Sequence, residues 1–369
     1  MIVRNEARVI GRCLESVRPF IDRWVIVDTG STDATKDIVR RRLADVPGEL
    51  HDRPWRDFAH NRNEALDLAL GKADYVLFID ADEELVPRPG FRLPVLSADA
   101  YRLCHRIGSD NSYHRTQLVR SALPFRYVGV MHEVVVCATP HTAEKMDGIE
   151  IRDHFDSARN ADPKAKYAAD AAVLERALET EPGNARHVFY LAQSYRDCGR
   201  LADALAAYRR RAEMGGWPEE VWYALFQIAV LEERTGGDFP RLLAAYLAAH
   251  QYRPERAEAL CALARICRLK GDHSLAYIFA RQAAETKEPE DILFLDTSVY
   301  AWRALDELSI AEYWTGRRAA AATDCRKLLS NGTLPETERG RVIDTLNFAL
   351  RAMGEPEYSE LPRPEGTER

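Results

Sequence analysis

Residues 24–33 read WVIVDTGSTD, an apolar run that ends in an aspartate and a polar turn. A short run rich in β-branched residues predicts a buried strand, and the polar turn can cap a helix over about 33–44. A second buried strand is predicted over 75–79, and residues 58–70 before it show helical spacing. Strand–helix–strand alternation with continuously apolar strands predicts a parallel sheet with helices on both faces.

The sequence changes character near its middle. Shorter strand-like runs cover 100–106, 117–120, 128–136 and 148–152. After about residue 157 the pattern becomes helical and rich in alanine. We therefore predict an α/β domain over 1–156 and an all-α domain over 157–369.

The helical part repeats one spacing pattern three times. Large, small and glycine positions follow each other in steps of 4, 4, 5 and 4 residues. The three sets are Leu191, Tyr195, Gly199, Ala204 and Tyr208; Leu263, Cys267, Gly271, Ala276 and Ala280; and Leu308, Glu312, Gly316, Ala321 and Cys325. Glu312 fits its position poorly, but the spacing is typical of tetratricopeptide (TPR) repeats of about 34 residues. We expect a TPR-like helical solenoid, with a degenerate copy over 218–254 and a closing helix over 336–353.

Composition narrows the class of protein. The chain has 369 residues, a formal net charge of −7 and seven cysteines. The negative charge disfavours a nucleic acid as the main partner. The cysteines form no CxxC pair, so they give no sign of a zinc site or a disulfide framework. No apolar run reaches the roughly 18 residues of a membrane span, so we expect a cytoplasmic protein with no membrane association. The first apolar run, residues 1–3, is short for a strand and leaves open a misplaced start or a trimmed chain.

Acidic side chains follow both predicted buried strands. Residues 78–84 read FIDADEE, which places Asp80 and Asp82 directly after the second strand. Alternate residues of an extended segment face the same way, and open α/β sheets bind ligands at the carboxyl ends of their strands. Carboxylate oxygens suit Mg²⁺ or Mn²⁺, although such a pair also often caps a helix. Asp28 ends the first strand, where it can accept hydrogen bonds from a base or a sugar.

Four segments together resemble the family 2 glycosyltransferases of the GT-A fold. They are IVRNE at 2–6, DTGSTD at 28–33, AHNRN at 59–63 and DADEE at 80–84. With the helical repeats, the chain resembles the bacterial subgroup to which sublancin-type peptide S-glycosyltransferases are related. The resemblance implies a Rossmann-like nucleotide-sugar-binding sheet, a UDP-sugar donor and an inverting transfer of the hexosyl type.

The same resemblance assigns roles to individual residues. The donor-binding residues would be Val3, Arg4, Asp28, Arg62, Asp80 and Ala81. Asp82 would bind the metal ion, and His154 would supply a further ligand, a combination that favours Mn²⁺ somewhat over Mg²⁺. His154 could equally be a residue of the domain boundary that bonds the linker.

A general base is expected where the family places an acidic residue, often in an x-E-D setting. This sequence has Met131-His132-Glu133 there, which makes Glu133 the candidate. A positioned carboxylate can take the proton of the acceptor as it attacks, which typically contributes 10²–10⁴-fold to the rate. The alternative is a solvated glutamate at the end of a surface strand.

The helical part bears on the acceptor. TPR solenoids often present a concave surface to an extended peptide, so a peptide or protein acceptor with Cys, Ser, Thr or Asn as nucleophile is expected. The same helices could instead form a homodimer. A glycan, a lipid-linked sugar or a modified DNA base stay open as acceptors. Two other functions also stay open. One is a non-catalytic scaffold that joins a GT-A-like domain to a TPR adaptor. The other is a nucleotidyltransferase, which the sequence does not support with a glycine-rich phosphate loop.

Overall fold

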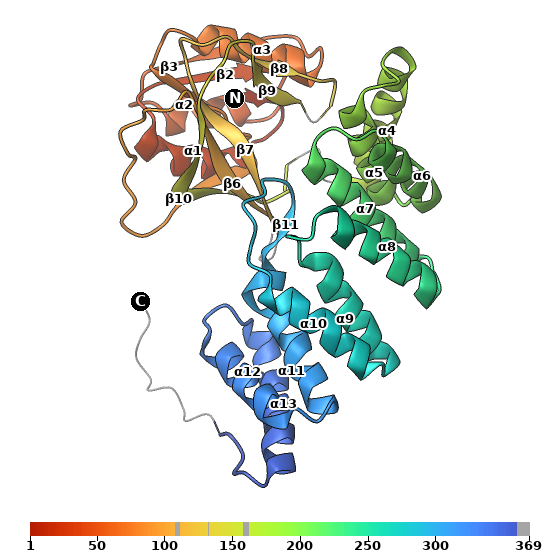
Figure 1. Cartoon of the computed structure of the whole chain (residues 1–369). Helices are drawn as coiled ribbons and strands as arrows, with labels where there is room; N and C mark the ends of the chain where they lie inside the picture. The colour runs from red at the N-terminus through yellow and green to blue at the C-terminus, as the bar shows by residue number, and fades with distance from the viewer. Residues whose placement is uncertain (108–110, 132, 158–161, 360–369) are drawn as a thin grey trace. The chain divides into compact units, whose positions relative to one another are not determined.

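The structure is a computed structural model that describes residues 1–107, 111–131, 133–157 and 162–359. It contains two compact units. The first unit comprises Met1–Leu231 and Asp291–Leu295, and the second comprises Glu232–Glu290 and Asp296–Arg369. The first unit therefore holds both strands and helices, drawn from red through yellow to green in Figure 1. The predicted division between residues 156 and 157 falls between the last long strand and the first repeat helix, and it stays a prediction.

Two sheets and a hairpin make up the β structure. The strands are β1 (Ile2–Val3), β2 (Trp24–Asp28), β3 (Gly48–Asp52), β4 (Tyr75–Leu77), β5 (Glu83–Pro87), β6 (Ala100–Ile107), β7 (Asn111–Arg120), β8 (Phe125–Val128), β9 (Val134–Cys137), β10 (Ala143–Asp153) and β11 (Leu295–Asp296). Strands β1, β2 and β3 form a parallel sheet in that order. The second sheet has the order β11-β7-β6-β10-β5, with β4 paired to β7.

The second sheet corrects the expectation of one parallel sheet. Only β10 and β6 pair in parallel in the registers of this sheet, whereas β6–β7, β4–β7 and β10–β5 are antiparallel. Residues 108–110 alone separate β6 from β7, and so short a link cannot make a parallel crossover. The strand-like run over 128–136 is also divided, because β8 and β9 form a hairpin that turns at Gly129, whose φ is +113°.

Helices flank the strands and then fill the rest of the chain. The first unit contains α1 (Ile10–Val17), the short η1 (Arg18–Phe20), α2 (Thr35–Arg42), α3 (Phe58–Ala69), α4 (Pro163–Thr180), α5 (Ala185–Cys198) and α6 (Leu201–Glu213), and α7 (Pro218–Arg234) ends just beyond it. The second unit contains α8 (Phe239–Tyr252), α9 (Glu258–Lys270), α10 (His273–Glu285), a π-helical turn (Val299–Arg303), α11 (Ala304–Trp314), α12 (Arg318–Ser330) and α13 (Glu336–Met353).

The repeat glycines lie where the spacing predicts them. Gly199, Gly271 and Gly316 follow α5, α9 and α11 with φ of +90°, +81° and +83°, the left-handed region in which a helix commonly ends on glycine. The alanines of each set are buried between the paired helices. Helix α13 covers the range of the predicted closing helix. A part with strands and helices up to Asp153 is thus followed by helix pairs, as the sequence predicts. Among the described residues, no helix is long and apolar enough to cross a membrane.

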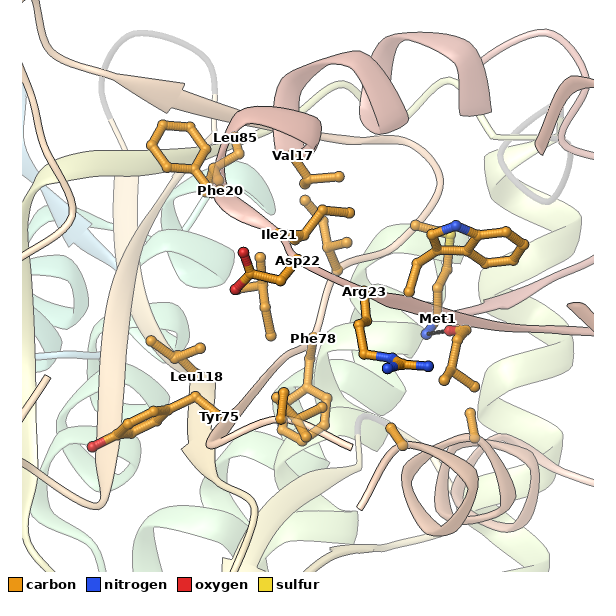
Figure 2. A pocket seen from close by; sticks show the side chains of 18 of the residues that line it. Met1, Val17, Phe20, Ile21, Asp22, Arg23, Tyr75, Phe78, Leu85 and Leu118 are labelled. Atoms are coloured by element: carbon orange, nitrogen blue, oxygen red, sulfur yellow. Dashed lines mark hydrogen bonds between the residues drawn. The ribbon is translucent and has the colours of Figure 1, made fainter. Parts of the chain in front are cut away.

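An apolar cavity lies beside β1 in the first unit. Its volume is about 360 Å³, and residues of β2 and β4 both line it. Figure 2 shows Val17, Tyr75, Phe78 and Leu118 around it, with Met1 at one side. The cavity lies below the strand ends at which the site residues are found.

Candidate functional site

The turn after β2 presents one carboxylate oxygen without a partner. Asp28 is fully buried, and its Oδ1 accepts hydrogen bonds from the backbone N–H groups of Gly30 at 2.9 Å and Ser31 at 2.8 Å. Gly30 has φ of +107°, a conformation that favours glycine. Oδ2 of Asp28 is buried and has no hydrogen-bond partner. Because an unsatisfied buried carboxylate oxygen is costly, this atom suits a ligand N–H or O–H group.

The end of β1 is tied to the same turn. The carbonyl oxygen of Val3 accepts hydrogen bonds from the backbone N–H of Thr29 at 2.9 Å and from its hydroxyl at 3.1 Å. Asn5 Oδ1 accepts from the backbone N–H of Thr32 at 2.8 Å. The side chain of Val3 is buried in the core, while Arg4 is exposed to solvent beside the turn. The two predicted donor-binding residues at the end of β1, Val3 in the strand and Arg4 after it, therefore differ in exposure.

Arg62, from α3, joins two of the predicted carboxylates. It bonds Asp80 in a bidentate manner, Nη1 to Oδ1 at 2.7 Å and Nη2 to Oδ2 at 2.9 Å, and its Nε forms an ion pair with Glu133. The guanidinium lies 5.5 Å from the centre of the Tyr127 ring. Burial opposes the charged form of Arg62, but Asp80 and Glu133 outweigh it and raise its pKa well above the usual value. Burial likewise opposes ionisation of Asp80, yet Arg62 lowers the pKa of this carboxyl.

Asp82 directly precedes β5 and His154 directly follows β10, and these two strands pair with each other. The antiparallel register pairs Asp153 with Glu83, so His154 continues opposite Asp82. Burial raises the pKa of Asp82, and nearby Asp80 adds to the effect. The Nε2 atom of His154 lies 2.8 Å from Glu84 Oε2. Ala81, between the two aspartates, is buried among the core residues of α1 and β2. Of the three, Asp82 and His154 offer an oxygen and a nitrogen ligand from the ends of two paired strands.

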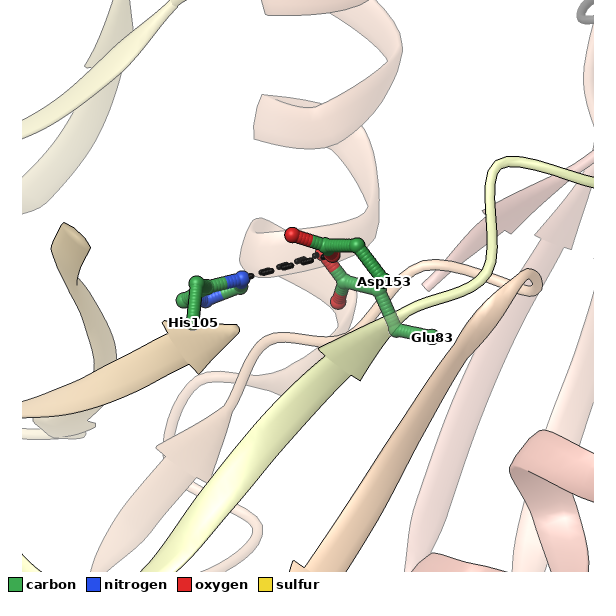
Figure 3. Close-up of side chains that lie close together, drawn as sticks. All are labelled: Glu83, His105 and Asp153. Carbon is green, nitrogen blue, oxygen red and sulfur yellow. Dashed lines mark hydrogen bonds and ion pairs between the residues drawn. The ribbon is translucent and has the colours of Figure 1, made fainter. Parts of the chain in front are cut away.

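A buried polar cluster lies next to these residues. Single ligand atoms of Glu83, His105 and Asp153 lie within 4.8 Å of one another, the one such group of three His, Cys, Asp or Glu among the described residues. Figure 3 shows His105 pointing from β6 toward Asp153, with Nδ1 and Oδ1 3.4 Å apart. Tyr113 donates its hydroxyl to Asp153 at 3.1 Å, and Arg115 donates to Glu83 at 2.8 Å.

Burial controls the charge of this cluster. It lowers the pKa of His105 to about 3, with the nearby Arg115 acting in the same direction. It raises the pKa of Asp153 to about 6, against the attraction of Arg115. Glu83 already has a cationic partner in Arg115, and Glu83 and Asp153 are the chain neighbours of Asp82 and His154. The sequence analysis did not select His105, Tyr113 or Arg115; the signal would have been charged and aromatic residues on the inward face of predicted strands.

Comparison with known proteins connects this geometry to a family. Residues 1–91 match the family described as glycosyl transferase family 2, and this range contains the Asp28 turn, Arg62, Asp80 and Asp82. This part of the chain is therefore similar to a family 2 glycosyltransferase domain. Glycosyltransferase SunS of Bacillus phage SPbeta is 36% identical over 83 residues, which are 22% of this chain and 19% of SunS. The match therefore covers only about a fifth of that relative.

Two proteins described as tetratricopeptide repeat proteins are also similar to this chain, and the match to the first of them extends beyond the helical part. A TPR repeat-containing protein of Synechococcus elongatus is 29% identical over 310 residues, 77% of this chain and 73% of that protein. A solved tetratricopeptide repeat protein from Parabacteroides merdae is 19% identical with a TM-score of 0.37, and the likeness covers 52% of this chain and 69% of the other. The chain thus joins a region similar to family 2 glycosyltransferases to helices with the TPR-like spacing.

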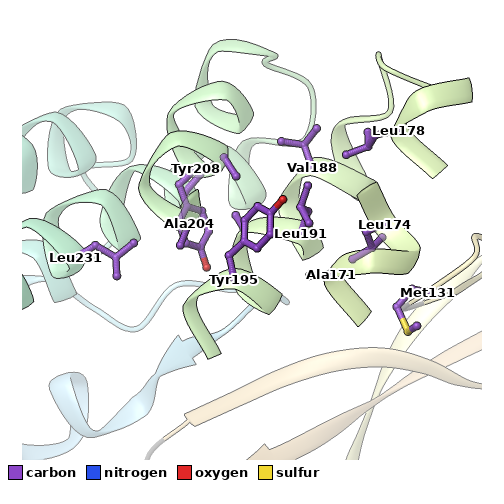
Figure 4. Packing of buried hydrophobic residues seen from close by; sticks show 13 residues of the cluster. Met131, Ala171, Leu174, Leu178, Val188, Leu191, Tyr195, Ala204, Tyr208 and Leu231 are labelled. Carbon is purple, nitrogen blue, oxygen red and sulfur yellow. The ribbon is translucent and has the colours of Figure 1, made fainter. Parts of the chain in front are cut away.

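The glycosyltransferase strands are joined to the first repeat helices within the first unit. Met131, two residues before Glu133, is buried in one cluster with Ala171 and Leu174 of α4. Figure 4 shows its side chain beside these residues, and the cluster continues to Leu191 in α5. Glu133 therefore lies two residues after a residue that packs against the helices. His132, between the two, lies outside the described residues.

Proposed function

We propose that this protein is a metal-dependent, inverting glycosyltransferase that moves a hexose from a UDP-sugar to a peptide or protein side chain. The observation that carries the proposal is the unpartnered buried Oδ2 of Asp28 at the end of β2. A uracil ring offers an N–H group to such an oxygen. The site lies at the carboxyl ends of parallel strands, where open α/β sheets bind nucleotides. All seven cysteines are free, which suits a reducing cytoplasm.

Asp82 and His154 would hold the metal ion. The chemistry of the two side chains fits Mn²⁺ or Mg²⁺, with imidazole favouring Mn²⁺. Burial and neighbouring acidic groups disfavour the ionised form of Asp82, which a bound cation would relieve. A divalent cation at this position would neutralise charge on the departing diphosphate. Asp80 would bind the donor beside it, with Arg62 fixing the direction of its carboxylate.

Glu133 would act as the general base. Its side chain is largely buried, and the ion pair with Arg62 fixes its position. It would take the proton from a thiol, hydroxyl or amide of the acceptor while that atom bonds to the anomeric carbon. The bond from this carbon to the diphosphate breaks on the opposite face, so an α-linked donor gives a β-linked product without a covalent intermediate.

The helices support a peptide or protein as acceptor. TPR-like helix pairs commonly bind extended peptides, and here α4 and α5 share a hydrophobic cluster with Met131 next to the proposed base. The resemblance to peptide S-glycosyltransferases points the same way. A homodimer is the other common use of such helices, and size measurement in solution would detect it.

Release of UDP from a panel of UDP-sugars tests the function. We expect turnover with Mn²⁺ that EDTA abolishes and that Asp82→Ala lowers by at least 100-fold, while Asp37→Ala, at an exposed site on α2, stays active. If no sugar nucleotide binds or turns over, and Asp82→Ala behaves like Asp37→Ala, the scaffold alternative is correct. Offering peptides, glycans, lipid-linked sugars and modified DNA in parallel then identifies the acceptor class.

A further inference from the structure

The β8–β9 hairpin has an open edge on the side of β9. The two strands form a sheet of their own (Figure 1), in which Tyr127 lies opposite Val135. The backbone N–H of Tyr127 donates to Asn63 Oδ1 at 2.9 Å, and its carbonyl accepts from Asn63 Nδ2 at 3.0 Å. Because Asn63 belongs to α3, both backbone groups of Tyr127 point away from β9 and toward that helix.

The direction of these groups determines the direction of the groups on β9. In an antiparallel pair, opposite residues either exchange both backbone hydrogen bonds or point their backbone groups outward. Tyr127 and Val135 are a pair of the second kind. Phe125 and Cys137 are another, because the N–H of Phe125 donates to the carbonyl of Leu123. The N–H and C=O groups of Val135 and Cys137 thus face the outer edge of β9, and none of the four has a hydrogen-bond partner within the described residues.

This edge lacks the features that keep a strand from pairing with another chain. Exposed edge strands usually carry a charge, a proline or a bulge for that purpose. Residues 134–137 read VVVC and contain none of these. Val128 and Val136 are 52% and 41% exposed on the outward face of the hairpin, so an added strand would lie beside apolar side chains. Such an edge is a template for an extended peptide, whose backbone supplies the hydrogen bonds.

The edge leads to the proposed general base. Glu133 directly precedes β9, and its carboxylate is held by the ion pair with Arg62. In an extended chain, residues 133 and 135 have side chains on the same face, roughly 7 Å apart along the strand. A residue of an added strand that lies opposite Glu133 would point its side chain to that same face. Backbone pairing with Val135 would therefore place one side chain of the peptide beside the carboxylate of Glu133.

We propose that the outer edge of β9 binds the acceptor as an extended peptide in antiparallel pairing, with the nucleophile opposite Glu133. The inference rests on the proposed function, because the role of Glu133 belongs to it. The residue two places before the nucleophile would then exchange both backbone hydrogen bonds with Val135. Side chains one and three places before the nucleophile would lie beside Val134 and Val136, which favours apolar residues there. The acceptor would be recognised by its backbone and by an alternating apolar pattern.

Peptide binding to the parent chain tests the inference. The probe is Lys-Thr-Val-Thr-Val-Ser-Thr-Lys, with serine as the nucleophile, and calorimetry with UDP and Mn²⁺ measures its binding without sugar transfer. The control peptide, Lys-Val-Thr-Val-Thr-Ser-Thr-Lys, has the same composition with the apolar positions shifted by one. We expect the probe to bind roughly 5-fold or more tightly than the control, and to slow amide hydrogen exchange in β9. Equal binding of the two peptides, or no protection of β9, would overturn the inference.

Methylation of single peptide nitrogens tests the pairing itself. At the threonine two places before the serine, an N-methyl group replaces the hydrogen that would bond to Val135. At the valine one place before the serine, the N–H would point away from β9. We expect the first methylation to weaken binding roughly 10-fold or more and the second to leave it within about twofold. The reverse order would indicate parallel pairing and contradict the proposal, as would equal losses.

A proline at residue 135 gives the matching test in the protein. Val135→Pro removes a backbone N–H that faces outward, which an edge strand tolerates, whereas Val135→Ala keeps this N–H and shortens the side chain. We expect Val135→Pro to weaken peptide binding roughly 10-fold or more with unchanged UDP affinity, and Val135→Ala to stay within about twofold of the parent. An equal loss in both variants would assign the effect to the side chain and contradict the inference.

Two outcomes distinguish this site from the proposed activity. Protection of β9 by the probe without turnover of any UDP-sugar would support the peptide site and remove the transferase activity. Glycosylation of a peptide that leaves β9 unprotected would support the activity and overturn the site. Protection of β9 that grows with protein concentration in the absence of peptide would assign the edge to a second copy of the chain, which also overturns the inference.

Discussion

One carboxylate oxygen of Asp28 accepts two backbone hydrogen bonds and the other has no partner. The substitution Asp28→Asn distinguishes the roles of the two oxygens. In Asp28→Asn the remaining carbonyl oxygen can still accept from Gly30 and Ser31, while an NH₂ group replaces the free oxygen. A donor then faces the N–H of the uracil ring, so binding loses a hydrogen bond to a charged group, worth about 1.5–3 kcal/mol. We expect UDP affinity, measured by calorimetry, to fall roughly 10- to 150-fold.

Asp33 provides the matched control in the same turn. Its carboxylate accepts hydrogen bonds from Thr35 and from the backbone N–H of Ala7, which is a structural role. Asp33→Asn should therefore lower the thermal stability slightly and leave UDP affinity within about twofold, a change below 0.5 kcal/mol. An unchanged affinity in Asp28→Asn, or an equal loss in both variants, would remove Asp28 from the donor site.

Two glycines of the helical part should respond to replacement by alanine with opposite changes in stability. Gly271 ends α9 with φ of +81°, where any side chain is strained, so Gly271→Ala should destabilise the protein by about 1 kcal/mol or more. Gly340 lies inside α13, and a Cβ there meets open space. Gly340→Ala should stabilise by about 0.5–1 kcal/mol because alanine is the better helix former. Urea unfolding measures both, and equal signs would contradict the repeat assignment.

Glu312 makes the third repeat helix pair, α11 and α12, sensitive to pH. It is buried in α11, and burial, with Asp324 of α12 nearby, raises its pKa from 4.5 to about 7. The folded state therefore favours the protonated form. Its contribution to stability is full below pH 4.5 and is lost as the pH rises through about 7. The loss is at most about 3 kcal/mol.

A neutral side chain at this position should remove the dependence. Glu312→Gln is expected to unfold at nearly the same urea concentration at pH 5 and pH 8, and to exceed the parent in stability at pH 8. Glu285→Gln, at an exposed site on α10, should keep the parental difference between the two pH values. A parental difference that survives in Glu312→Gln would place the titrating group elsewhere.

Local patterns predicted the elements well where the signal lies within one element. The glycine spacing identified α5, α9 and α11 and their ends, because a helix end is decided by a few neighbouring residues. Most strands were found, although β5 and β11 were not predicted. Their pairing was not found either: β10 joins β6 in parallel and β5 in antiparallel, a choice made by tertiary contacts. His105 was missed for the same reason, since its partner Asp153 lies on another strand.

The whole chain is not divided at one point in the sequence. It leaves the first unit after Leu231 and returns to it for Asp291–Leu295. The returning segment is held by its backbone: the N–H groups of Ile292 and Leu293 donate to Glu219 at 2.7 Å, and the carbonyl of Ile292 accepts from His114 at 2.7 Å. The sequence pattern could not predict that this segment returns to the first unit, because the segment pairs with the edge of β7 only once that strand has folded.

Phe294 tests whether the returning segment belongs to the first unit. Its ring centre lies 4.8 Å from that of Tyr223 and 5.8 Å from that of Tyr113, which in turn bonds Asp153. Phe294→Ala should destabilise the first unit by about 1–3 kcal/mol, less than for a fully buried ring because Phe294 is half-buried. Hydrogen exchange should then speed up in β7 and α7.

The exposed Phe348 of α13 gives the matching control, because Phe348→Ala removes a ring of the same size from the second unit. It should leave exchange in β7 unchanged. If Phe294→Ala instead accelerated exchange only in α9–α13, the segment would act as part of the second unit, although it lies on β7. Acceleration in β7 with α9–α13 unchanged is the expected result, because the aromatic contacts of Phe294 with Tyr113 and Tyr223 lie in the first unit.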